Sequence, residues 1–145
     1  MYSLELDATL NVAHAAVWQT WTDISSFPDW DPREEEATLN GPFAVGSTVH
    51  SKQRGNPGGE ATIVAIEDGH RWTVAKPLPG GRLVIDHRLE PVGEHYVRVV
   101  KRYDVYGPIA LVFRLVFAPK IRQSMPASFE ALEREARRRA LVTAA

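Results

Sequence analysis

The feature that most constrains the fold is a helical pattern at the C-terminal end of the chain. Apolar residues recur there at steps of three or four positions, at Ile121, Met125, Phe129, Leu132, Ala136 and Ala140. Charged residues fall between them, so the pattern predicts an amphipathic helix with one face to bury. Almost everything before this helix has strand-like patterns. The simplest arrangement is an α+β fold in which the helix packs across the concave face of one curved sheet.

The C-terminal helical region, residues 107–140, is too long to be one straight helix inside a compact domain. A straight helix would span ~50 Å, whereas a compact domain of this length has a diameter of roughly 38 Å. Pro119 and Pro126 each remove a backbone donor and crowd the preceding turn. We therefore expect a long, kinked helix with its break between residues 118 and 126, and with the apolar run 109–117 buried at its start.

Short connections rich in glycine and proline divide the preceding chain into strand-like runs. Residues 3–12 alternate between apolar and polar side chains, which is typical of a half-buried strand. Six further runs follow, at residues 35–40, 46–54, 60–67, 71–76, 82–91 and 95–106. Their connections suit antiparallel hairpins and are too short for parallel crossovers. The pattern therefore predicts a seven-stranded antiparallel sheet.

Two short helices are expected between the first and second strands. Val17, Trp21 and Ile24 lie at helical spacing. Asp23 can cap a second short helix, which Pro28 should end.

Composition narrows the class of protein. A chain of 145 residues suits one domain over residues 1–145. Lys and Arg number 17 against 18 Asp and Glu, a balance that argues against nucleic acid as a partner. There are no cysteines, so disulfides and thiolate sites are excluded. We see no signal-peptide pattern and no apolar run near the ~20 residues that span a bilayer, and so expect a cytoplasmic protein without stable membrane insertion.

Several short motifs occur in an order that resembles a known superfamily. They are Val17-Trp18, Trp21-Thr22-Asp23, Phe27-Pro28-Asp29-Trp30-Asp31-Pro32, the segment 39–47 (LNGPFAVGS) and Gly107-Pro108. The chain resembles the START-like, birch-pollen-allergen-like superfamily (SRPBCC), in its polyketide cyclase/dehydrase branch. The resemblance implies a helix-grip fold, in which a seven-stranded antiparallel sheet wraps the C-terminal helix around an elongated apolar cavity. It also implies binding of lipids, steroids, polyketides or plant hormones, and in some members cyclisation or dehydration.

Standard catalytic and metal-binding motifs are absent from the sequence. The histidines at positions 14, 50, 70, 87 and 95 form no pair at ligand spacing. We therefore expect neither a metal nor a cofactor.

The candidate functional groups are polar residues on the inward side of strands. Alternation in the run 82–90 places His87 on the same face as Leu83, Ile85 and Leu89. His87 is then either a general acid or base, or a core histidine bonded to backbone or water. Tyr103 is a candidate pocket hydroxyl on the last strand.

Other residues on these faces complete the expected site. Lys101 would lie near the cavity mouth if the strand register holds. The expected ligand-binding residues are Gln53, Trp72, Leu83, Ile85, Val99, Phe113 and Phe117. Trp72 is also interpretable as simple core. Glu34 stands where relatives commonly carry an apolar residue; we favour an exposed strand start, and the alternative is a carboxylate at the cavity rim that pairs with His87.

These observations predict a protein that binds a small hydrophobic molecule (a lipid, a steroid or a polyketide-like compound) between sheet and helix, as a monomer or homodimer. The alternative is a polyketide cyclase, aromatase or dehydratase. There His87 would abstract an acidic α-proton and Tyr103 would hydrogen-bond the developing enolate. A third possibility is an interaction module whose run 109–117 is exposed for docking.

Overall fold

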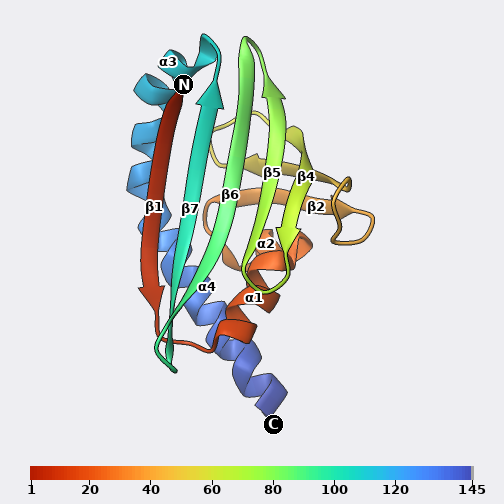
Figure 1. Cartoon of the computed structure of the whole chain (residues 1–145), viewed down its shortest axis with the longest axis vertical. Helices are drawn as coiled ribbons and strands as arrows, with labels where there is room; N and C mark the ends of the chain where they lie inside the picture. Colours follow the sequence, from red (N-terminus) through yellow and green to blue (C-terminus); the bar gives the residue numbers. More distant parts are fainter. Residues whose placement is uncertain (145) are drawn as a thin grey trace.

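The computed structural model describes residues 1–144, which form one seven-stranded antiparallel sheet and a long C-terminal helix (Figure 1). The strands lie in the order β1-β7-β6-β5-β4-β3-β2. Their bounds are β1 Tyr2–Leu10, β2 Glu34–Asn40, β3 Thr48–Gln53, β4 Gly59–Glu67, β5 Arg71–Leu78, β6 Gly81–Val92 and β7 Tyr96–Tyr106. The helices are α1 His14–Thr22, η1 Ile24–Ser26, α2 Phe27–Trp30, α3 Ile109–Val112, η2 Phe113–Phe117 and α4 Ala118–Ala144. The predicted sheet is confirmed, and each predicted strand overlaps one observed strand.

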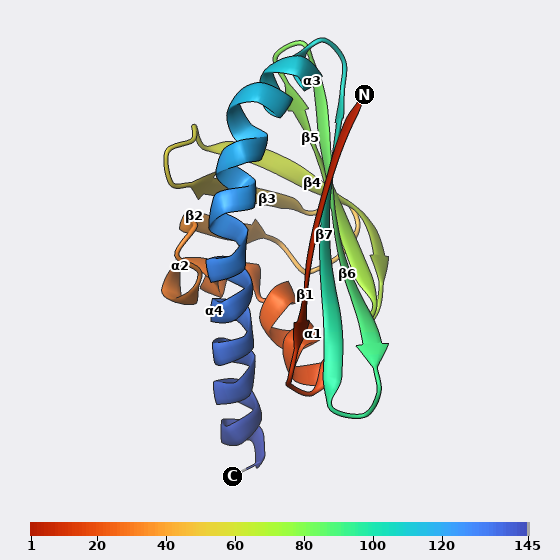
Figure 2. The same ribbon diagram turned by 90° about the vertical axis from the view of Figure 1, so that its left-hand side faces the viewer.

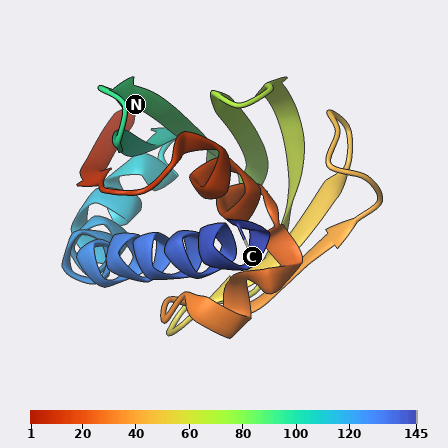
Figure 3. The same cartoon turned by 90° about the horizontal axis from the view of Figure 1, so that it is seen from below.

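The sheet curls around α4, as seen from the side in Figure 2 and from below in Figure 3. Two irregularities in strand register help it to bend: one lies between Glu34 and Glu36 in the β2–β3 pair, and the other between Ile63 and Ala65 in the β4–β5 pair. An extra residue in one strand of an antiparallel pair bends that strand and increases its twist. The expected helix-grip arrangement is confirmed.

The short helices follow β1 as predicted, with one difference. Pro28 does not end the second helical segment; it lies in the first turn of α2. A proline is tolerated there because the first N–H groups of a helix have no intrahelical partner. Pro28 therefore marks the start of α2 and not its end.

The C-terminal helix is continuous but changes its winding once. In η2 the helix widens to π geometry, and the Ala118 N–H donates to the carbonyl of Phe113, five residues earlier. Pro119 follows directly, and in a regular α-helix its ring would crowd the carbonyl four residues before it. The wider turn removes that conflict. Figure 2 shows the part of the helix before α4 bending over the end of the sheet.

The predicted break between residues 118 and 126 is wrong. α4 continues through Pro126 to Ala144, and the irregular turn lies before Pro119. The length conflict is resolved mainly by projection, since the C-terminal end of α4 extends past the sheet in Figure 2.

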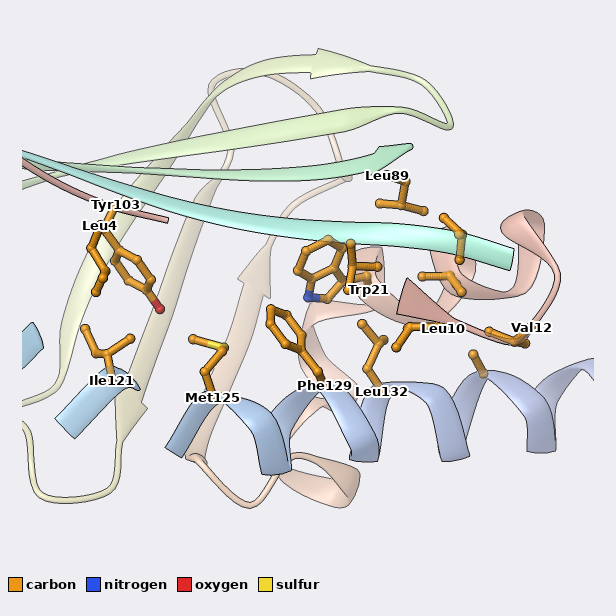
Figure 4. Packing of buried hydrophobic residues seen from close by; sticks show 14 of the residues in the cluster. Leu4, Leu10, Val12, Trp21, Leu89, Tyr103, Ile121, Met125, Phe129 and Leu132 are labelled. Carbon is orange, nitrogen blue, oxygen red and sulfur yellow. The ribbon is translucent and has the colours of Figure 1, made fainter. Parts of the chain in front are cut away.

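One face of α4 forms the main core with the sheet and α1 (Figure 4). Ile121, Met125, Phe129 and Leu132 on this face are buried, as the helical pattern predicts. A second, smaller cluster lies under β3, β4 and β5 and includes Ile63 and Trp72. Trp18, Phe27 and Ile85 touch both clusters. No helix within residues 1–144 is long and apolar enough to span a membrane.

The start of the C-terminal helix is only partly buried. Phe113 lies in the core, whereas Leu111, Val112, Leu115 and Val116 are exposed. The expectation that the whole run 109–117 is buried is therefore wrong. A short helical segment at the end of the sheet has one neighbour to pack against, so only one of its faces is covered.

Candidate functional site

His87 occupies the centre of the inner face of the sheet. It lies on β6, paired with Trp72 of β5 on one side and with Lys101 of β7 on the other. The imidazole stacks on the Trp72 ring at a centroid separation of 3.7 Å, and the Trp21 ring lies nearly perpendicular to it at a centroid separation of 5.1 Å. Only 4% of His87 is exposed. Its inward orientation agrees with the alternation of the strand.

The surroundings of His87 hold the imidazole neutral. Burial lowers the pKa of His87 well below its usual value, the Lys101 ammonium lowers it further, and the hydrogen bond to the Trp72 carbonyl opposes them only in part. That bond joins Nδ1 to the carbonyl oxygen at 3.2 Å. A carbonyl can only accept, so Nδ1 carries the proton and Nε2 presents its lone pair. No residue within 1–144 is hydrogen-bonded to Nε2.

Glu34 turns inward from the start of β2. It is 7% exposed, and both carboxylate oxygens accept hydrogen bonds from the Gln53 amide, at 3.0 and 3.2 Å. Burial raises the pKa of Glu34, and the Lys101 charge lowers it again in part. The favoured expectation of an exposed Glu34 is wrong, and Gln53 is engaged by this carboxylate. Lys101, half-buried between His87 and Tyr103 on the inner face, therefore acts electrostatically on both Glu34 and His87.

A second polar group ties the start of β2 to α4. The Ser128 hydroxyl donates to one oxygen of the Asp31 carboxylate at 2.7 Å, and the backbone N–H of Arg33 donates to the other at 2.9 Å. The Arg33 side chain donates from Nε to the Ser124 hydroxyl at 2.9 Å. Sequence reasoning missed these residues, because only the wrapping of β2 onto α4 brings residues 31–33 to residues 124–128.

Tyr103 projects from β7 toward the helix. In Figure 4 its hydroxyl points from the sheet toward the space between Ile121 and Met125. Its ring packs near Phe113, and the Lys101 ammonium lies 5.6 Å from the ring centre. Tyr103 is thus buried on the same face as His87, two positions along β7 from the residue that pairs with His87.

The apolar residues expected to bind ligand are part of the packed interior. Leu83, Val99 and Phe113 are buried in the main core cluster, and the partly buried Ile85 and Phe117 pack against it. Trp72 is buried in the second cluster, where its indole Nε1–H has no hydrogen-bond partner among residues 1–144.

Two pockets open at the edges of the molecule. One, of about 260 Å³, lies between β1 and α4 and is lined by Leu6, Leu10, Met125 and Phe129 among others. The other, of about 170 Å³, lies between the end of β3 and α4, and Gln53 contributes to its wall. Neither of these two pockets is lined by His87 or Tyr103, although the structure brings both residues to the same face of the sheet.

A sheet curled around a long helix, with polar side chains turned toward that helix, defines a helix-grip, START-like protein. The chain belongs to the family described as polyketide cyclase / dehydrase and lipid transport, which matches residues 1–137. No curated protein matches the chain.

Solved structures with the same fold cover nearly the whole chain. The Zhui aromatase/cyclase from Streptomyces sp. R1128 has a TM-score of 0.80 at 14% identity, covering 96% of this chain and 95% of that one. A START superfamily protein from Mycobacterium smegmatis has a TM-score of 0.76 at 9% identity, covering 95% and 99%. Norcoclaurine synthase from Thalictrum flavum, in complex with dopamine and hydroxybenzaldehyde, has a TM-score of 0.66 at 12% identity, covering 92% and 84%. At these identities the likeness concerns the fold alone.

Proposed function

We propose that the protein binds a small, mainly apolar molecule between the inner face of the sheet and α4. A lipid, a steroid or a polyketide-like compound fits this description, and the family description names polyketide chemistry and lipid transport. His87, Tyr103 and Gln53 orient the polar groups of the ligand, while Leu83, Ile85, Val99, Phe113 and Phe117 supply apolar contacts.

The observation that carries the proposal is that two neighbouring polar groups, the Trp72 indole N–H and the His87 Nε2, have no hydrogen-bond partner among residues 1–144. The Trp72 indole N–H is buried and unpaired among residues 1–144, and it belongs to the ring stacked on His87. Leaving a buried donor unpaired costs about 1–3 kcal/mol. A ligand carbonyl or hydroxyl oxygen that accepts from this N–H removes that cost. A ligand hydroxyl can in turn donate to His87 Nε2.

Native mass spectrometry of the purified protein tests the proposal first, by looking for a co-purified small molecule. Thermal shift with a panel of fatty acids, steroids and aromatic polyketides follows, and at least one class should raise Tm. For a ligand with a carbonyl group, Trp72→Phe keeps the stacked ring and removes the N–H, so affinity should fall roughly five- to tenfold.

Trp30→Phe is the matched control, because the Trp30 indole N–H already has a partner within the protein, the Ser26 hydroxyl at 3.1 Å. It should leave ligand affinity unchanged. If no class of compound co-purifies or shifts Tm, the binding proposal is wrong.

The alternative function is cyclisation or dehydration of a poly-β-ketone. The specific observation that favours it is the His87 tautomer, since a neutral imidazole with a free Nε2 lone pair beside the Lys101 ammonium suits removal of an acidic α-proton. His87 would take the proton at Nε2. Lys101 and Tyr103 would then stabilise the enolate oxygen, by charge and by a hydrogen bond respectively.

The pH dependence of turnover tests this alternative. A base with a lowered pKa is already unprotonated at pH 6.5, so kcat/KM for a poly-β-ketone should be level above that pH. It should fall at lower pH, as His87 becomes protonated. Turnover that is unchanged in His87→Ala would show that His87 is not the base.

A further inference from the structure

The pocket between the end of β3 and α4 is lined by several positively charged side chains. Its volume is about 170 Å³. Its polar lining residues are Arg33, Gln53, Arg54, Asn56, Lys120 and Ser124. Three of the six are cationic and none is acidic. Within residues 1–144, no carboxylate lies within 4.0 Å of the charged nitrogens of Arg33, Arg54 or Lys120, whereas arginines on the outer face of the sheet pair with carboxylates, as Arg98 does with Asp7 and Glu90.

Arg33 is the unusual member of this group. It is only 9% exposed. Its guanidinium donates from Nε to the Ser124 hydroxyl, and its Nη1 lies 4.0 Å from the sulfur of Met125, a weak acceptor. A guanidinium has five N–H donors, and buried arginines are ordinarily paired with an acid. Most of the donor capacity of Arg33 is therefore unused by the protein.

The nearby carboxylates do not take up this capacity. The Asp31 oxygens accept hydrogen bonds from the Arg33 backbone N–H and the Ser128 hydroxyl. The Glu34 oxygens accept from the Gln53 amide. Within residues 1–144, neither carboxylate is hydrogen-bonded to the Arg33 guanidinium.

Two of the cationic side chains, Arg33 and Arg54, are held by hydrogen bonds within the protein. The Arg54 N–H donates to the Arg33 carbonyl at 3.0 Å, and Arg54 Nε donates to the Pro32 carbonyl at 2.7 Å. The Asn56 side-chain oxygen is buried at the same pocket and accepts no hydrogen bond within residues 1–144. A ligand hydroxyl beside an acidic group would satisfy it. Such preorganisation reduces the cost of ordering the site on binding.

We propose that this pocket binds the carboxylate or phosphate group of an amphipathic ligand, with Arg33 as the buried anchor and Arg54 and Lys120 at the rim. The apolar part of the ligand then passes Ile121, which lines both this pocket and the core, into the space between the sheet and α4. This assignment rests on the proposed ligand-binding function and adds the chemical class of the head group. A planar, two-pronged guanidinium suits either oxyanion.

Binding of matched ten-carbon compounds tests the assignment. Decanoate, decyl phosphate and 1-decanol are compared by calorimetric titration at concentrations below micelle formation. At least one of the two anions should bind roughly tenfold or more tightly than the alcohol, and the advantage should shrink as salt rises from about 50 to about 500 mM. The decanoate and decyl phosphate arms distinguish the two head groups.

Substitutions test whether the preference for anionic compounds arises in this pocket. The double variant R54Q/K120Q removes two exposed charges at the rim and should weaken anion binding roughly tenfold while 1-decanol binding stays unchanged. The double variant R114Q/R134Q removes two exposed charges elsewhere on the C-terminal helix and should change neither. Arg33→Lys keeps the buried charge but loses the two parallel N–H donors of the guanidinium, and should also weaken anion binding.

The possible outcomes distinguish a failure of the head-group site from a failure of the proposed ligand-binding function. Equal binding of all three compounds, unaffected by R54Q/K120Q, would overturn the head-group site and leave the proposed binding of an apolar molecule standing. Binding of inorganic phosphate but of none of the alkyl compounds would support the head-group site and count against the binding of an apolar molecule. Failure of all four probes to bind would overturn both.

Discussion

At the scale of single residues, the interior is arranged to keep His87 uncharged. The imidazole lies between the rings of Trp21 and Trp72, and its nearest charged neighbour on the inner face is the Lys101 cation. A carboxylate in that position would favour the imidazolium; an ammonium opposes it. Glu34, whose buried carboxylate interacts with the Lys101 charge, is held by Gln53. The site therefore carries a neutral hydrogen-bonding ring in an apolar setting.

This arrangement predicts a pH dependence of stability. The unfolded chain binds a proton at His87 below about pH 6.5, whereas the folded protein does not bind it until its lowered pKa is reached. The unfolded state then binds more protons in that window. The free energy of unfolding should consequently rise with pH up to about 6.5, by at most about 1.4 kcal/mol per pH unit from this group.

His87→Gln should remove that rise, measured by urea denaturation at a series of pH values. Glu34, whose pKa is raised, contributes a slope of the opposite sign upward from about pH 4.5, so the comparison with the wild-type protein isolates His87. His95→Gln, at a surface histidine, should keep the wild-type slope. The same slope in wild type and His87→Gln would mean that His87 binds its proton equally well in the folded and unfolded states.

At the scale of elements, the C-terminal helix accommodates its two prolines differently. Pro119 follows the π-helical turn η2, whereas Pro126 lies inside regular α4. The missing N–H at position 126 leaves the Arg122 carbonyl without its helical partner. The helix continues because its apolar face is buried on both sides of the proline, at Met125 and Phe129.

Pro126→Ala is therefore expected to stabilise the protein. The substitution restores a donor and a helix-favouring residue, worth up to about 3 kcal/mol, less roughly 0.4–1 kcal/mol for the greater freedom of the unfolded chain. A net gain of about 1–2 kcal/mol in the free energy of unfolding should follow, measured by chemical denaturation. Pro119→Ala should gain less, because η2 already accommodates that residue. A loss of stability in Pro126→Ala would show that the helix needs the proline.

The start of the same helix has one face in the core and one in solvent. Phe113→Ala removes a ring that is 5% exposed and contacts Tyr2, Tyr103 and Phe117, and should cost about 3–5 kcal/mol. Leu115→Ser, at a side chain that is 65% exposed, should change stability by less than about 0.5 kcal/mol. Denaturation curves of the two variants check both values. A large loss in Leu115→Ser would show that this face is covered in solution.

At the scale of the whole molecule, the sheet and the helix that crosses it could be predicted because each depends on a local pattern. The periodicity of a segment shows which side chains share a face, and the apolar face is the one that is buried. This holds for the alternation in residues 82–91 and for the helical spacing of Met125, Phe129 and Leu132. The placement of His87 and Tyr103 on the inner face followed from the same alternation. The helix boundaries near Pro28 and Pro119 could not be predicted in the same way, because a proline marks a boundary without showing on which side of it the helix lies.

The polar part of the site depends on contacts that no local pattern records. Glu34 is buried because Gln53 reaches it across the β2–β3 pair, and Arg33 is buried because β2 is drawn onto α4 by the bond between Asp31 and Ser128. Glu34 is the first of three consecutive glutamates and Arg33 precedes them, a charged segment that by itself indicates an exposed position. Their burial follows from the curvature of the whole sheet, to which the two register irregularities contribute.

The end of the molecule near α3 is closed by a tight backbone contact. The tip of the β5–β6 hairpin meets the turn before α3, where the Ile109 N–H donates to the Gly80 carbonyl at 3.3 Å. Gly107 has φ of +90°, and a Cβ added to it would lie 2.5 Å from the Gly80 oxygen. The start of the C-terminal helix is therefore held against the β5–β6 hairpin, and opening this end of the molecule requires the hairpin to separate from α3.

Gly107→Ala tests this closure against a matched control. Gly93 also has positive φ, +71°, but a Cβ there meets nothing within 4 Å, so Gly93→Ala should cost only the conformational penalty of about 1–2 kcal/mol. Gly107→Ala adds a clash with backbone that cannot move aside, and should cost about 3–4 kcal/mol. Hydrogen exchange should also increase at Ile109 and at the hairpin tip in Gly107→Ala and not in Gly93→Ala. Equal costs in the two variants would mean that the hairpin and α3 are already apart in solution.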